Sequence, residues 1–200
     1  MAKKIAHIIL AAGSSSRLGS PKQLLPWKNT SLIANEVEKS LKLKRLVTVV
    51  VLGAHFEIIQ KEIKHFPVEI LYNKNWKSGM GASISFGIRH ILNDDILYDA
   101  VLISLIDQPF IDEVHFGKLI SEFDKNQNTI ITTGMKDRMG VPAIFPRGYF
   151  EELLALNEDY GARMIIKNNM NQIITVDGKD MTDDIDTIEQ YRVLSKRVKE

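Results

Sequence analysis

The sequence predicts an α/β protein with three layers, in which helices cover both faces of a doubly wound, mostly parallel sheet. Short β-branched apolar runs alternate with amphipathic segments along the whole chain, as expected for parallel strands joined by helical crossovers. Two runs, 5–12 and 45–52, are apolar at almost every position, which is typical of strands buried on both faces. Polar loops follow several runs directly, and ligands of such sheets bind beyond the carboxyl ends of the strands.

Each element is predicted from apolar periodicity, β-branched content and capping residues. Strands are expected at 5–12, 45–52, 68–72, 99–106, 129–133, 141–145 and 172–176. Helices are expected at 32–43, 55–65, 82–92, 112–123, 147–156, 161–167 and 188–199. Ser31 and Asp112 are the expected N-caps of the first and fourth helices, because their side-chain oxygens can accept from free backbone N–H groups.

Composition limits the classes of function. The 200 residues suffice for one domain with a substantial core, which we expect to span 1–200. A formal net charge of +1 gives no general bias toward polyanions, so no nucleic-acid partner is expected. The chain has no cysteine, which excludes disulfides and thiolate metal sites and fits a cytoplasmic location. No apolar run approaches a membrane span, and the N-terminal run is too short for a signal peptide.

The first predicted strand ends at a small polar loop that suits an anion. Gly13 is followed by three serines, and the loop also carries Arg17, Gly19 and Lys22. Backbone N–H groups in such a loop can surround a phosphate, while arginine binds phosphate bidentately and lysine acts as a mobile point charge. The spacing matches neither the P-loop nor the dinucleotide-binding fingerprint. The alternative is a tight turn with two solvated cations.

Asp107 directly follows the apolar strand 99–106, which brings it to the same edge of the sheet. A carboxylate there suits a divalent metal beside phosphates, because Mg²⁺ usually takes one or two carboxylates, substrate oxygens and water. The structural alternative is that Asp107 only caps a turn. The five histidines are scattered without metal-ligand spacing, so no catalysis is assigned to them.

A second polar loop, 73–83, contains an amide, an indole, two glycines and hydroxyls. Gly79 and Gly81 would let the backbone approach a flat ring closely, and Asn73 and Ser83 could bind polar edges of that ring. In the alternative interpretation, Trp76 fills the core and the glycines only begin a helix.

Four motifs together resemble one enzyme family. They are Leu-Ala-Ala-Gly at 10–13, Ser-Arg-Leu-Gly at 16–19, Pro-Lys-Gln-Leu-Leu-Pro at 21–26 and Asp-Gln-Pro at 107–109. The chain resembles the MobA-like nucleotidyltransferases of molybdenum cofactor synthesis from Leu10 to Tyr191. The resemblance implies a Rossmann-like nucleotidyltransferase fold, with a nucleotide-binding half, 1–106, and a half for metal and acceptor, 107–200.

Within that family, the motifs at 20–26 and 107–109 are more similar to the cytidylyl branch. This implies CTP and molybdopterin as substrates, Mg²⁺ or Mn²⁺ as cofactor, pyrophosphate as a product and a molybdoenzyme as recipient. Two alternatives of the same fold are a guanylyltransferase and a sugar-phosphate nucleotidyltransferase. An alternative of another class is a non-catalytic carrier of nucleotide or cofactor that serves molybdoenzyme maturation.

The resemblance also implies roles for individual residues. Arg17, Lys22 and Asp107 are the expected catalytic residues, and all three are expected to contact the nucleotide. The other expected nucleotide-binding residues are Leu10, Ala11, Ala12, Gly13, Ser14, Ser15, Asn73, Gly79, Met80 and Ser83.

Three later segments complete the expected site. Asp186 lies in Ile-Asp-Thr-Ile-Glu-Gln-Tyr, which resembles a family segment that carries a second metal ligand, so Asp107 and Asp186 are the expected metal ligands. The alternative is a solvated acidic run that caps the last helix. Gly140 and Pro142 belong to a segment resembling Gly-His-Pro, with Val141 in place of histidine. These two residues and Arg163 are the expected acceptor-binding residues, although Arg163 could instead form a surface ion pair.

Overall fold

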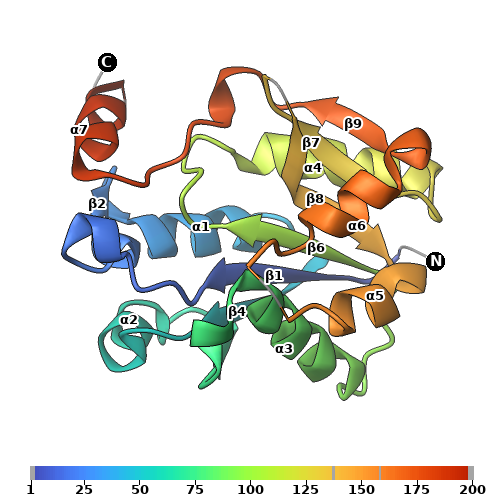
Figure 1. Ribbon diagram of the computed structural model, residues 1–200, viewed down its shortest axis with the longest axis horizontal. Coiled ribbons are helices and arrows are strands. Elements are labelled where there is room, and N and C mark those ends of the chain that lie inside the picture. Colours follow the sequence, from blue (N-terminus) through green and yellow to red (C-terminus); the bar gives the residue numbers. More distant parts are fainter. Residues whose placement is uncertain (1–2, 137, 158, 198–200) are drawn as a thin grey trace.

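The computed structural model describes residues 3–136, 138–157 and 159–197 and forms an α/β fold around one large sheet (Figure 1). In this described part of the chain the sheet has seven strands in the order β5-β4-β1-β6-β8-β7-β9. The strands are β1 (Ile5–Ala11), β4 (Leu46–Leu52), β5 (Glu69–Tyr72), β6 (Ala100–Leu105), β7 (Ile131–Gly134), β8 (Met139–Pro146) and β9 (Ile174–Asp177). Only β8 runs antiparallel to its neighbours among these strands. The predicted doubly wound, mostly parallel sheet is confirmed.

The helices lie close to their expected positions. They are α1 (Leu32–Leu41), α2 (Phe56–Ile63), α3 (Met80–Leu92), α4 (Glu113–Lys125), α5 (Phe150–Leu154), α6 (Arg163–Asn168) and α7 (Ile188–Arg197). Both predicted N-caps are confirmed, since Ser31 Oγ accepts from Ala34 N at 3.3 Å and Asp112 Oδ1 from His115 N at 2.8 Å. None of the helices in the described residues is long and apolar enough to cross a bilayer.

Several boundaries differ from the sequence prediction. Helix α3 begins at Met80, two residues before the expected start, so that Met80 and Gly81 form its first turn. The helix expected at 147–156 is a 3₁₀ turn, Arg147–Tyr149, followed by the short α5. A two-stranded hairpin of β2 (Pro26–Trp27) and β3 (Thr30–Ser31) was not expected, because strands of two residues have no periodicity. The last helix was expected to reach 199, but residues 198–200 lie outside the described residues.

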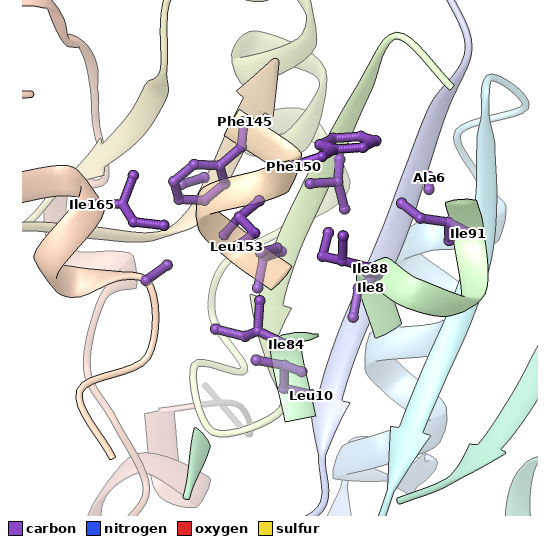
Figure 2. Packing of buried hydrophobic residues seen from close by; sticks show 14 of the residues in the cluster. Ala6, Ile8, Leu10, Ile84, Ile88, Ile91, Phe145, Phe150, Leu153 and Ile165 are labelled. Atoms are coloured by element: carbon purple, nitrogen blue, oxygen red, sulfur yellow. The ribbon is translucent and has the colours of Figure 1, made fainter. Parts of the chain in front are cut away.

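One face of the sheet is covered by α3, α5 and α6 (Figure 2). Ile8 and Leu10 of β1 point to this face and pack with Ile84 and Ile88 of α3 in one buried cluster. Phe145 of β8 extends the cluster beneath α5 and α6. Burial of such side chains contributes about 1.5–3 kcal/mol each, which anchors α3 and its first turn over the carboxyl end of β1.

The opposite face is covered by α1, α2 and α4. Ile5 and Ile9 of β1 point to it, because side chains alternate along a strand. Ile9 packs with Val37 of α1, and Ile5 packs in a second cluster that includes Phe116 of α4. Both clusters are buried, so the fold has the predicted three layers.

The segment after β9 returns across the carboxyl end of the sheet before α7. In Figure 1 the arrowheads of β1 and β6 point to the end of the molecule where β2 and α7 lie. Ile185 is buried with Trp27 and Leu194, and its N–H donates to Asp107 O at 2.8 Å. This packing brings the acidic segment near Asp186 next to the loop after β6.

Candidate active site

Two adjoining cavities lie beyond the carboxyl ends of β1 and β6. The first, of about 500 Å³, is formed by the loop after β1, the turn before α3 and the end of β6. Its lining residues are Leu10, Ala11, Ala12, Gly13, Ser14, Lys22, Gln23, Trp76, Lys77, Gly79, Met80, Ser83, Leu105, Ile106, Asp107 and Asp159.

The second cavity, of about 350 Å³, lies on the side of β8 and α6. Apolar side chains, including three methionines, form much of its wall, and Arg138, Arg163 and Asp184 add charges. Leu10, Met80, Leu105 and Asp107 line both cavities. The two cavities therefore share a wall that includes Asp107.

The loop after β1 is held in place by Gln23. This side chain is 1% exposed, and its amide donates to Ala11 O at 2.9 Å and to Gly13 O at 2.8 Å. Ser15 adopts a left-handed conformation (φ 56°), and its hydroxyl accepts from Lys22 N at 3.0 Å. The hydrogen bonds of the described residues leave the N–H groups of Gly13 and Ser14 unused, so these groups can bind an anion in the first cavity.

Lys22 joins the predicted catalytic residues. Its ammonium group donates to Asp107 Oδ2 at 2.8 Å, to Ile185 O at 3.1 Å and to Asp186 Oδ1 at 3.3 Å. The Arg17 guanidinium lies 3.3 Å from Asp186 Oδ2. Residues from three distant segments thus form one charged cluster, although Arg17 and Asp186 line the second cavity and not the first.

Asp107 and Asp186 fit a divalent cation. Asp107 Oδ1 is buried and has no hydrogen-bond partner among the described residues. Its other oxygen and Asp186 share the Lys22 ammonium, so both carboxylates reach one cation. The described residues contain no group of three or more acidic, histidine or cysteine ligands. Two carboxylates with open positions for phosphate oxygens and water are the donor set that Mg²⁺ and Mn²⁺ accept.

Asp184 is a third carboxylate that the sequence interpretation missed. Burial raises its pKa, and the Asp107 carboxylate raises it further. Arg138 opposes this shift in pKa, with its guanidinium 3.5 Å from Asp184 Oδ2. The acidic run at 183–186 was a signal for it, but a run of acids does not indicate which members face a cavity.

Of the residues expected to bind the base in the loop between β5 and α3, only some line a cavity. Gly79, Met80 and Ser83 line the first cavity, together with Trp76 and Lys77. Asn73 is not among the lining residues. It is 2% exposed, its amide donates to Ser83 Oγ at 3.1 Å and its Oδ1 accepts from Asn75 N at 2.9 Å, so its side chain shapes the loop.

The expected acceptor-binding residues are also divided. Gly140 and Arg163 line the second cavity, whereas Val141 lines it in place of Pro142. Pro142 O instead accepts from Thr133 Oγ1 at 2.7 Å, which ties β8 to β7. Asp159, to which no role was assigned, lines the first cavity.

Two curated relatives match almost the whole chain. The "Nicotine blue oxidoreductase" of Paenarthrobacter nicotinovorans is 29% identical over 202 residues, covering 95% of this chain and 96% of the relative. The "Purine catabolism protein PucB" of Bacillus subtilis (strain 168) is 27% identical over 204 residues, covering 94% and 95%.

Among solved structures, Rv0371c from Mycobacterium tuberculosis H37Rv superposes with a TM-score of 0.84 at 25% identity, covering 98% of this chain and 99% of that chain. That protein has also been solved in complex with manganese, and this second structure gives a TM-score of 0.79 at 22% identity, covering 97% and 99%. Residues 7–173 match the family model described as the MobA-like NTP transferase domain, and this chain therefore belongs to that family of nucleotidyltransferases.

Proposed function

We propose that this chain is a molybdenum cofactor cytidylyltransferase, which transfers CMP from CTP to the phosphate of molybdopterin and releases pyrophosphate. The observation that carries the proposal is the wall at Asp107 that the two cavities share. A nucleotide in the first cavity and a phosphorylated acceptor in the second would bring their reacting groups together there.

The first cavity has the groups that a triphosphate needs. The free N–H groups of Gly13 and Ser14 can bind phosphate oxygens, and Lys22 lies beside the shared wall at which the α-phosphate would react. Arg17 lies near the same wall and can neutralise charge as pyrophosphate departs. Trp76 and Gly79 also line this cavity and offer flat surfaces for the base.

The reaction needs little covalent help from the protein. An oxygen of the acceptor phosphate attacks the α-phosphorus of CTP, and the bond from that phosphorus to the oxygen bridging the β-phosphate breaks. The electron pair leaves with pyrophosphate. No general base is required, because the acceptor phosphate is ionised near neutral pH. Orientation of the two substrates and neutralisation of charge by Lys22 and Arg17 therefore supply the rate enhancement.

Asp107 and Asp186 would hold Mg²⁺ or Mn²⁺. When bound, such a cation supplies positive charge beside the reacting phosphate oxygens. The manganese complex of the mycobacterial structural neighbour supports this choice of metal.

The second cavity suits a flat acceptor with an anionic group. Met80, Met135 and Met139 can pack on a conjugated ring, because thioethers are polarisable and adaptable. Arg163 and Arg138 can meet an anion. Val141 cannot hydrogen-bond through its side chain, so hydrogen bonds to the ring would come from other polar residues of this cavity, such as Gln108 and Tyr160.

Pyrophosphate release tests the proposal directly. The protein is supplied with Mg²⁺ and molybdopterin, and with CTP, GTP, ATP or UTP in turn. Release with CTP alone is expected. Release with GTP alone would instead indicate a guanylyltransferase. Release only when a sugar phosphate replaces molybdopterin would indicate a sugar-phosphate nucleotidyltransferase.

Two further outcomes would contradict the proposal that this chain catalyses nucleotidyl transfer. Binding of nucleotide without pyrophosphate release from any acceptor would indicate a carrier. Consumption of NADH or NADPH without pyrophosphate release would indicate an oxidoreductase, the activity in the name of the Paenarthrobacter relative. Asp95→Ala is a suitable control variant for the transferase assays, because Asp95 is an exposed acid outside both cavities.

A further inference from the structure

Asp159 lines the first cavity together with Trp76, Lys77 and Gly79 of the turn before α3. The loop after β1 contributes Gly13 and Ser14 to the same cavity. Asp159 belongs to the segment before α6, which otherwise faces the second cavity through Tyr160 and Ala162. One loop therefore contributes to both cavities.

Close packing at two glycines holds Asp159 in this position. Gly79 has φ +102°, and a methyl group added there would overlap Asp159 Oδ1 and lie 2.9 Å from Asp159 N. Gly161 has φ +56°, and a methyl group there would lie 2.8 Å from Met80 Sδ. Both conformations favour glycine. The two glycines let the segments at 79–80 and 159–161 interlock, so the carboxylate is held directly against the turn before α3.

The Asp159 side chain has no other assigned task. No hydrogen bond or ion pair among the described residues uses its carboxylate, and the residue is exposed. The neighbouring Lys77 also lines this cavity, with its ammonium 5.7 Å from the centre of the Trp76 ring. A flat ring beside Trp76 would meet one acceptor of hydrogen bonds, Asp159, and one donor, Lys77.

We propose that Asp159 is a specificity-determining residue that selects a base with an exocyclic amino group and rejects uracil. This inference rests on the proposed function, because it requires a nucleotide in the first cavity. A carboxylate only accepts hydrogen bonds. It would accept from the N4 amino group of cytosine, while the Lys77 ammonium donates to a ring acceptor. Uracil has a carbonyl oxygen in place of that amino group, and two facing acceptors repel each other.

The expected discrimination is moderate. A buried site that hydrogen-bonds a substrate amino group can reject an analogue lacking it by 10⁴-fold or more. Asp159 is exposed, so water can solvate the mismatched groups. We therefore expect a preference for CTP over UTP of about 10- to 100-fold, which is the scale of one hydrogen bond to a charged group.

Isothermal titration of the wild type and of Asp159→Asn with CTP and UTP, in Mg²⁺ and without acceptor, tests the inference. Asparagine keeps the shape of the side chain and can donate to the uracil carbonyl as well as accept. The ratio of the dissociation constant of UTP to that of CTP should be about 10 or more in the wild type and about 3 or less in Asp159→Asn. The main cause is tighter binding of UTP by the variant. A misfolded variant would not gain affinity. Asp95→Asn is the matched control and should keep the wild-type ratio.

Three results would overturn the inference. They are equal affinity of the wild type for CTP and UTP, an unchanged ratio in Asp159→Asn, and equal weakening of both nucleotides, which would indicate a contact to the ribose. Absence of any nucleotide binding by the wild type would overturn both this inference and the proposed function. If the titrations give the expected change in ratio but the activity assay shows no pyrophosphate release with any acceptor, only the proposed function is contradicted.

Discussion

Lys22 is the side chain in which the charges of the site converge. It lies in the 3₁₀ turn Lys22–Leu24 and is 15% exposed, with two carboxylates within 3.3 Å. Its ammonium group lies 2.8 Å from Asp107, which lines both cavities. We therefore propose that Lys22 stabilises the charge that develops on the α-phosphate and on the leaving pyrophosphate.

Replacing Lys22 by alanine should lower kcat for pyrophosphate release by about 10²-fold or more, the scale on which loss of one transition-state charge stabiliser acts. Steady-state kinetics with saturating nucleotide measure this effect. Lys61→Ala on the exposed surface of α2 is the control. Nearly full activity of the Lys22→Ala variant would contradict a catalytic role for Lys22.

Asp107 can be changed without loosening its loop. The backbone carbonyl of Asp107, and not its side chain, accepts the N–H of Ile185, so the C-terminal segment keeps its anchor in a variant. Asp107→Ala should abolish turnover while circular dichroism and the unfolding midpoint stay close to those of the wild type. Loss of turnover together with loss of the fold would contradict a purely catalytic role, and Asp95→Ala controls for removal of an acid.

At the scale of the element, the loop after β1 depends on Gln23. Two carbonyl groups in this loop accept from one buried amide. The backbone N–H groups of Gly13 and Ser14, which line the first cavity, have no hydrogen-bond partner among the described residues, and we propose that they bind phosphate. The effect of Gln23 on function is therefore indirect, through the shape of the loop.

Gln23→Ala removes both hydrogen bonds, each worth about 0.5–1.5 kcal/mol. We expect the dissociation constant of the nucleotide to rise by about tenfold or more, because the free loop loses the shape that binds phosphate. Calorimetric titration with CTP measures the change. Gln127→Ala, an exposed position after α4, should leave nucleotide binding unaltered. Unchanged affinity in Gln23→Ala would contradict the role assigned to this amide.

At the scale of the whole molecule, a buried histidine couples stability to pH. His7 of β1 is completely buried, with Nδ1 2.7 Å from Ser40 Oγ and Nε2 2.9 Å from Ser104 Oγ. Ser104 in turn donates to Glu36 Oε1 at 2.6 Å, so Ser104 accepts from the imidazole. Burial is the main cause that lowers the pKa of His7 to about 3, and the Lys39 ammonium adds to it.

The sign of the pH effect follows from protonation of the two states. The unfolded chain binds a proton at His7 below a pH of roughly 6.5, whereas the folded protein resists protonation until about pH 3. The free energy of unfolding contributed by this group is therefore present above pH 6.5 and falls as pH drops toward 3. The slope is about 1.4 kcal/mol per pH unit.

Urea unfolding at pH 7 and pH 5 should thus show a loss of about 2 kcal/mol from His7. In a His7→Asn variant the loss over the same interval should be smaller by that amount, even if the variant is less stable at both pH values. An identical pH slope in the two proteins would show that His7 titrates alike in the folded and unfolded states.

Local sequence was sufficient for much of the fold and for one side of the site. Buried parallel strands require continuous apolar runs, and helices require caps and periodicity, so β1, β4 and α1 were predictable from their own residues. The loop after β1 was predictable for a similar reason, because its glycines, serines and cations stand next to one another in the chain. Asp107 was predictable because a strand delivers it directly to the edge of the sheet.

The tertiary structure alone decided which side chains face which cavity. Asn73 turned to its own loop, while Asp159 and Asp184, from segments without a strong pattern, reached cavity walls. The hairpin of β2 and β3 and the antiparallel course of β8 likewise had no signal in the sequence. The sequence by itself determined the layers and the chemistry of the first loop, since these depend on neighbouring residues. The wall that two cavities share at Asp107 depends on packing between segments far apart in the chain, which no local pattern records.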